Sequence, residues 1–137
     1  FFVEHKLVLG TLFIGFDFYQ ALTHPFAKAV YMLFLVSEVH PFADGNGRIA
    51  RVMMNAEFVR NEQSKIIIPT VYRDDYMIAL RRLSRQQDPS AYIRMMHRAW
   101  SFSATITGDQ IDRMEKHLAA SNAFKEHDMA KLKIITL

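Results

Sequence analysis

The chain has 137 residues, of which 50% are hydrophobic and 23% are charged, and it contains no cysteine. This length suits one domain, and the lack of cysteine excludes disulfides, cysteine-based zinc sites, iron–sulfur clusters and thiol nucleophiles. The formal net charge is +3, and Lys and Arg occur along the whole chain rather than in one stripe. Nucleic-acid binding is therefore not expected.

No segment predicts a membrane span or a signal peptide. The longest apolar run, residues 7–16, has ten residues and includes two glycines and a threonine, whereas a spanning helix needs about 20. We expect a cytoplasmic protein, with a translocated effector as the alternative. Because the first residue is Phe1 rather than Met, we also expect a fragment or a processed form.

Three helices are expected in the first half of the chain. Residues 4–22 are rich in apolar residues, and two glycines within them disfavour a helix but indicate close packing. Thr23, His24 and Pro25 are typical of a helix start. The helix predicted over 25–39 contains an apolar run, residues 29–36, which indicates burial on all sides, with a buried strand as the alternative.

A proline and two glycines separate that helix from the next one. Pro41 ends it, since the residue before a proline disfavours the helical region. A helix is then predicted over 46–61, with an apolar stripe made of Ile49, Val52, Met53, Ala56 and Val59.

The second half predicts three further helices with short connections. An extended connector at 66–69 precedes a helix over 74–85. Asp88 and Pro89 then begin a helix that runs to about residue 105, and a last helix starts near Ile111. Residues 131–137 fit no clear pattern. Several helices joined by short loops predict an all-α fold.

Residues 40–51, His-Pro-Phe-Ala-Asp-Gly-Asn-Gly-Arg-Ile-Ala-Arg, carry a chemical signature. Gly45 and Gly47 allow backbone N–H groups to point into one concavity, and the start of a helix adds free donors and the positive end of its dipole. Arg48 and Arg51 share a face of that helix, and guanidinium groups bind phosphate with two hydrogen bonds. The segment therefore predicts a phosphate site.

Two residues of the segment extend this prediction to a reaction. Asp44 would repel a phosphate unless a cation lay between them, and Mg²⁺ is usually held by one or two carboxylates together with substrate phosphates. His40 has the side chain best suited to accept a proton at neutral pH. The residues thus predict phosphoryl or nucleotidyl transfer from a Mg²⁺-bound nucleotide to a hydroxyl group.

The same residues resemble the signature of the Fic family, His-x-Phe-x-Asp/Glu-Gly-Asn-Gly-Arg-x-x-Arg, at all eight specified positions. The resemblance extends over roughly residues 4–105. It implies an all-α, compact helical Fic core with the signature loop between two central helices. Residues 1–108 would form this core, and residues 109–137 a C-terminal helical extension.

The resemblance implies a protein adenylyltransferase, which moves AMP from ATP to a Tyr, Thr or Ser hydroxyl of a target protein. His40 would be the catalytic base, and Phe42 would anchor the loop in the core. Asp44 would bind Mg²⁺. The remaining signature positions would bind the nucleotide phosphates: Gly45, Asn46, Gly47, Arg48 and Arg51.

Two family features outside the signature are not found in this sequence. We expect the β-hairpin flap that docks the target, and the first helices, to be missing. None of the glutamates is followed by Gly or Asn, so an inhibitory segment of the family type would lie upstream or on an antitoxin-like partner. The alternatives are transfer of phosphate or phosphocholine, removal of AMP, and a nucleotide-binding module without turnover.

Two rival motifs and one repeat overlap or imitate part of the signature. The run from Gly45 to Ala50 fits G-x-G-x-x-A, but a dinucleotide site needs a preceding strand, and none is predicted. A calcium-binding loop that starts at Asp44 is excluded, because the positions that require a ligand and a glycine hold other residues. His-Pro-Phe-Ala also occurs at 24–27, where no glycine loop follows, so His24 is interpreted as a helix-start residue.

Overall fold

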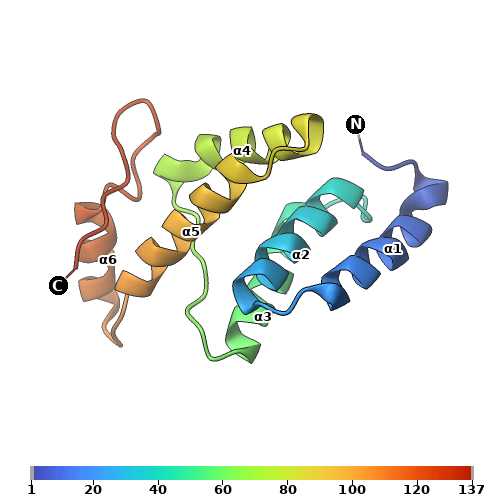
Figure 1. Cartoon of the computed structure of the whole chain (residues 1–137). Helices are drawn as coiled ribbons and strands as arrows, with labels where there is room; N and C mark the ends of the chain where they lie inside the picture. Colours follow the sequence, from blue (N-terminus) through green and yellow to red (C-terminus); the bar gives the residue numbers. More distant parts are fainter. Residues whose placement is uncertain (1, 137) are drawn as a thin grey trace. The chain divides into compact units, whose positions relative to one another are not determined.

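The chain folds into α-helices joined by short loops (Figure 1). The structure is a computed structural model that describes residues 2–136. Within them no strand occurs, which confirms the predicted all-α class and removes the strand alternative for residues 29–36. The helices are α1 (Val8–Ala21), α2 (Pro25–Val39), α3 (Asn46–Arg60), α4 (Arg73–Gln86), α5 (Ser90–Thr105) and α6 (Ile111–Ala120), with 3-10 turns at His5–Leu7 and Thr70–Tyr72.

The contacts between residues divide the chain into two compact units, whereas its length predicted a single domain. The first is Phe1–Gln63 and the second is Ser64–Leu137. The boundary falls at the start of a connector, residues 63–69, that has no helical hydrogen bonding. The predicted division into residues 1–108 and 109–137 concerns the extent of the family core, and it stays a prediction.

The first unit is built around α2. As predicted, α2 is buried over most of its circumference, and its fully or nearly fully buried residues include Ala29, Leu33 and Val39. Its main neighbour is α3, which lies alongside it in Figure 1. The loop between these two helices is the signature segment.

The predicted apolar stripe of α3 is wrong. Val52, Met53 and Val59 are exposed, by 67%, 39% and 56%. The buried face instead follows positions four apart, Asn46, Ala50, Met54 and Phe58, which form one row along a helix. A polar residue, Asn46, begins this row because its side chain is fully hydrogen-bonded to the preceding loop, and that bonding fixes which face turns inward.

Helix α1 packs closely on α2 at Gly15, as the sequence indicated. A Cβ atom at Gly15 would lie 2.4 Å from Leu35 Cδ1, and the Tyr31 hydroxyl donates to the Gly15 carbonyl at 3.0 Å. Tyr19 of α1 also donates a hydrogen bond to Glu57 of α3. That bond, followed by burial, raises the pKa of Tyr19, so the hydroxyl stays protonated and the bond is kept at neutral pH.

The second unit pairs α4 with α5 and covers part of α5 with the C-terminal segment. One buried cluster joins Val71, Phe102, Ala123 and Leu132. The Ser103 hydroxyl accepts a hydrogen bond from the Ile67 N–H at 2.7 Å, which ties the extended connector to α5. Asn122 donates to the Lys131 carbonyl at 2.9 Å, so the tail is held to the end of α6.

Tyr92 in α5 gives this unit a predicted sensitivity to alkali. Its side chain is 2% exposed, and burial raises its pKa well above the usual value of 10. The unfolded chain therefore loses the proton first, and the free energy of unfolding falls as pH rises above about 10, by up to about 1.4 kcal/mol per pH unit. Urea unfolding at pH 8 and at pH 11 measures this loss. The loss should be smaller in Tyr92→Phe, and an equal loss in both proteins would contradict the assignment.

No helix among residues 2–136 is long and apolar enough to cross a membrane.

Candidate functional site

The site begins where α2 ends, at His40. His40 is the C-cap of α2 and has φ 53° and ψ 57°, in the left-handed region. Histidine enters this region more often than most residues, but such backbone costs about 1–3 kcal/mol and is concentrated at functional sites. Its N–H donates to the Val36 carbonyl at 3.1 Å, which closes the helix. The backbone thus turns sharply at this imidazole.

Phe2 covers the ring of His40 in the structure. The two rings are stacked, with centroids 3.7 Å apart and planes 18° apart. Phe2 is itself 65% exposed, so it lies on the imidazole as a cover and does not fill a core. Sequence reasoning gave no role to Phe2, because a single apolar residue near a terminus carries no signal of its partner.

Removing this cover should make His40 more reactive. In Phe2→Ala, one face of the imidazole loses its stacked ring, so we expect diethyl pyrocarbonate to modify His40 several-fold faster. Peptide mapping by mass spectrometry measures the rate at each histidine, and exposed His24 serves as the reference within the same sample. If the rate at His40 relative to His24 does not change, Phe2 does not shield the imidazole.

Asn46 holds the loop in shape. Its Oδ1 atom accepts a hydrogen bond from the Phe42 N–H at 2.9 Å, and its Nδ2 group donates to the Phe42 carbonyl at 2.6 Å. Asn46 is 2% exposed. Asn46 was predicted to bind the nucleotide phosphates, and this stays a prediction. Because its side chain holds the loop, its backbone N–H at the start of α3 is the group expected to meet a phosphate.

The predicted role of the Phe42 side chain is corrected. It was expected to anchor the loop in the core, yet it is 50% exposed. The loop is anchored through the Phe42 backbone instead, because both of its polar groups are bonded to the Asn46 amide.

The glycines shape the start of α3. Gly45 is the N-cap with φ 81°, a conformation that disfavours any side chain. The first hydrogen bond of α3 runs from the Ile49 N–H to the Gly45 carbonyl at 2.9 Å. The N–H groups of Asn46, Gly47 and Arg48 therefore have no acceptor within the helix. They form a cluster of donors at the positive end of the helix dipole, which can bind an anion.

The charged residues of the segment lie at the surface around these donors. Arg48 Nη2 lies 3.0 Å from Asp44 Oδ2, and the two side chains are 72% and 91% exposed. Both are free to change partner on binding, because an exposed ion pair of this kind is weak. Arg51 is also exposed. All the predicted site residues thus lie on one continuous segment, between the end of α2 and the second turn of α3.

A magnesium site made of protein ligands alone does not occur in residues 2–136, since no group of three or more His, Asp or Glu side chains is placed to hold a metal. Asp44 is the only carboxylate in the segment. A single exposed carboxylate fits Mg²⁺ that is held mainly by substrate phosphates. The residues present are thus compatible with a metal brought in by the nucleotide.

Comparison with known proteins gives matches over the same region. The Fic/DOC family profile matches residues 10–57, which cover most of α1, all of α2, the loop and most of α3. The chain is 34% identical over 73 residues to "Protein adenylyltransferase Fic" of Drosophila persimilis, covering 53% of this chain and 14% of that protein. It is 31% identical over 78 residues to the protein of the same name from Drosophila melanogaster, covering 57% of this chain and 16% of that one.

A solved structure shares the fold. "Fic-1 (aa134 - 508) from C. elegans" superposes with a TM-score of 0.63 at 22% identity, covering 88% of this chain and 34% of that chain. At this identity the likeness concerns the fold alone. The chain therefore spans about one third of the solved relative, and 14% and 16% of the two Drosophila proteins.

Proposed function

This chain belongs to the Fic/DOC family, and from that premise we propose that it transfers AMP from ATP to a hydroxyl group of a target protein. The observation that carries the proposal is the loop from His40 to Arg51, where a sharp turn at an imidazole leads directly to unpaired N–H donors and two exposed arginines. A proton acceptor beside an anion site is what nucleotidyl transfer to a hydroxyl requires.

The proposed step assigns the proton to His40. The target hydroxyl gives its proton to the imidazole while its oxygen forms a bond to the α-phosphorus of ATP. The bond from that phosphorus to the bridging oxygen breaks, and pyrophosphate leaves with the bonding electrons. His40 then returns its proton to solvent.

The phosphates would be held by the start of α3. The N–H groups of Asn46, Gly47 and Arg48 face the anion, and the Arg48 and Arg51 guanidinium groups bind the terminal phosphates. Asp44 would release Arg48 and bind Mg²⁺, which neutralises phosphate charge when present. Phe2 would have to leave the imidazole before a hydroxyl could approach it.

Labelled ATP tests the proposal. The chain is incubated with a protein lysate and Mg²⁺, together with ATP labelled at either the α- or the γ-phosphate. Adenylyl transfer places the α label, and not the γ label, on protein. Transfer of the γ label would contradict the proposal and indicate phosphoryl transfer. Bound ATP with neither label on protein would instead indicate a nucleotide-binding module.

Two further predictions concern how the protein is regulated and where it is located. A regulatory segment, if it is of the family type, acts from upstream or from a second protein, because no glutamate in the sequence is followed by Gly or Asn. The cytoplasmic location expected from the sequence stays a prediction.

A further inference from the structure

The second unit carries most of the positive charge of the chain. It has twelve Lys and Arg against eight Asp and Glu, a net charge of +4, whereas the first unit has five against six, a net charge of −1. Part of this charge lines two cavities. The two arginines of the signature segment, Arg48 and Arg51, belong to the first unit and are not part of this charge.

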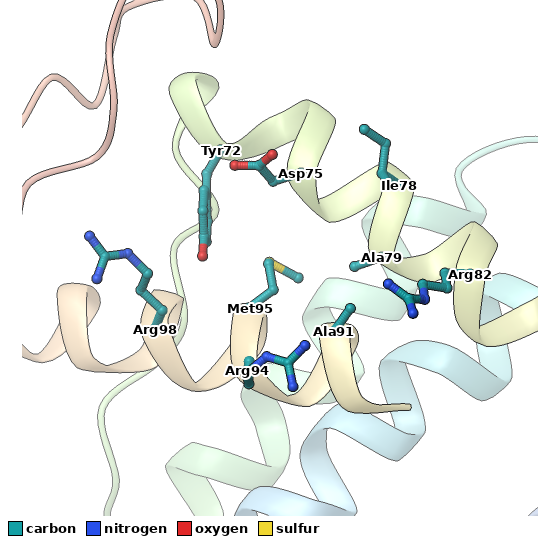
Figure 2. Close-up of a pocket in the computed structure, with 9 residues that line it drawn as sticks. All are labelled: Tyr72, Asp75, Ile78, Ala79, Arg82, Ala91, Arg94, Met95 and Arg98. Atoms are coloured by element: carbon teal, nitrogen blue, oxygen red, sulfur yellow. The ribbon is translucent and has the colours of Figure 1, made fainter. Parts of the chain in front are cut away.

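The first cavity lies between α4 and α5 and has a volume of about 350 Å³. Its floor is apolar, with Met95, Ala79 and Ala91 among its residues, and three arginines stand around it: Arg82, Arg94 and Arg98. Figure 2 shows Arg98 toward one end of the cavity and Arg82 toward the other, with Arg94 and Met95 between them on α5.

The second cavity adjoins the first. It has a volume of about 430 Å³, and it shares Tyr72, Asp75 and Arg98 with the first cavity. The C-terminal segment lines its other side and adds Lys131 and His127. The two cavities together form one groove, called here the basic groove. The carboxylate of Asp75 lines both cavities, but it is outnumbered by the cationic side chains of Arg82, Arg94, Arg98 and Lys131.

The arginines of the basic groove differ in whether their guanidinium groups already have a hydrogen-bond or ion-pair partner within the chain. Arg98 donates to the Leu132 carbonyl at 2.9 Å, and Arg82 pairs with Asp88 at 3.0 Å. The Arg94 side chain is exposed and makes no hydrogen bond or ion pair with any of residues 2–136, although its charge interacts electrostatically with nearby Asp88. Arg94 is therefore the cation most available to an incoming carboxylate.

We propose that the basic groove binds an acidic peptide segment of a partner protein in an extended conformation. Arg94 and Arg98 are four residues apart on one helix, a rise of about 6 Å. Alternate side chains of an extended peptide are about 6.6 Å apart. The backbone positions of the two arginines are thus spaced like every second residue of such a peptide, and Figure 2 shows their side chains pointing toward different parts of the cavity. A peptide with acidic residues at every second position could offer one carboxylate to each, and arginine clusters are a recurrent device for reading acidic motifs.

Two features favour a peptide over nucleic acid. Asp75 lies within the groove. It would repel a nucleic acid, which carries a phosphate at every nucleotide, and it would also repel a glutamate, but a peptide can place a neutral residue or a backbone N–H donor against it. The apolar floor gives the small side chains of a peptide a surface to pack on. Burial raises the pKa of Tyr72, so its hydroxyl stays protonated and can donate to a carboxylate.

Fluorescence anisotropy with a labelled decapeptide of alternating Glu and Ala tests this proposal on the whole chain. No nucleotide is added, so the result does not depend on AMP transfer. We expect binding that weakens with salt, and a Kd that rises about tenfold in Arg94→Glu, since the substitution replaces attraction by repulsion. Arg81→Glu changes the net charge equally, but Arg81 is exposed outside both cavities, so its Kd should stay close to that of the parent.

Several outcomes would overturn the proposal. These are no binding of the Glu–Ala peptide, equal binding of a Lys–Ala peptide, and equal weakening by Arg94→Glu and Arg81→Glu. Tighter binding of a ten-nucleotide RNA, lost in Arg94→Glu, would assign the groove to nucleic acid instead. Complete displacement of the peptide by millimolar inorganic phosphate would reduce it to a site for small anions.

Discussion

The His40→Asn variant should transfer AMP about 10²–10⁴ times more slowly than the parent chain, the range typical for loss of a general base. Asparagine is the substitution to use, because it tolerates the left-handed backbone found at His40 better than alanine does. It cannot accept the proton of the attacking hydroxyl at neutral pH. The rate of α-label incorporation into protein measures the loss.

His24→Asn is the matched control for this variant. The same four residues, His-Pro-Phe-Ala, occur at 24–27 and at 40–43, but His24 only precedes the first turn of α2. Asparagine is a good N-cap, so His24→Asn should fold and transfer AMP like the parent. Equal losses in both variants, or full activity in His40→Asn, would remove His40 from the proposed mechanism.

Asn46→Ala should lower the free energy of unfolding by about 1–3 kcal/mol and should also reduce AMP transfer. The substitution leaves the N–H and the carbonyl of Phe42 without their partners, and unpaired polar groups of this kind cost about that amount. Because the side chain is occupied by the loop, the loss of activity follows from loop distortion and not from a lost phosphate contact. Urea unfolding and the transfer rate are measured together.

Asn61→Ala provides the comparison for Asn46. Asn61 also uses its amide on a backbone group, donating to the Glu57 carbonyl at 2.8 Å, but at the exposed end of the same helix. Its replacement should cost less than about 1 kcal/mol and leave transfer unchanged. Asn46→Asp keeps an acceptor for the Phe42 N–H but loses the donor, so its stability should lie between the parent and Asn46→Ala. If Asn46→Ala is as stable as Asn61→Ala, the loop does not depend on Asn46.

Local sequence signals predicted most of the fold. Proline and glycine positions fix the ends of α2 and the start of α3, and both were predicted to the residue. The period of apolar residues also predicted the remaining helices closely. These signals act within a few residues, which is why a sequence alone reveals them.

The faces of the helices were harder to predict, because they depend on partners distant in sequence. In α3, hydrophobic Val52 is exposed while polar Asn46 is buried, since hydrogen bonding to the loop outweighs the hydrophobicity of individual residues. In α1, only Gly15 and Tyr19 are buried although most of its residues are apolar. A prediction from amphipathic patterns assumes that the apolar side chains of a helix face a core. In both α1 and α3, many apolar side chains face outward instead.

The candidate site also combines residues that a local pattern predicts with contacts between distant residues that it does not predict. The signature residues were identified because they lie in one continuous segment, residues 40–51, and their roles stay predictions. The stacking of Phe2 on His40 joins residues 38 positions apart. The basic groove joins α4, α5 and the C-terminal segment. No local pattern predicts contacts of that kind.

Binding of the ATP phosphates by the loop from His40 to Arg51 is the step on which the proposed function depends. It is tested most directly by the amide signals of the five glycines, recorded by ¹H–¹⁵N NMR while Mg²⁺ and ATP are added to the chain. Gly45 and Gly47 should shift in a saturable manner, while Gly10, Gly15 and Gly108, which lie outside the loop, should not. Saturable binding of ATP with Gly45 and Gly47 unchanged would contradict binding at this loop.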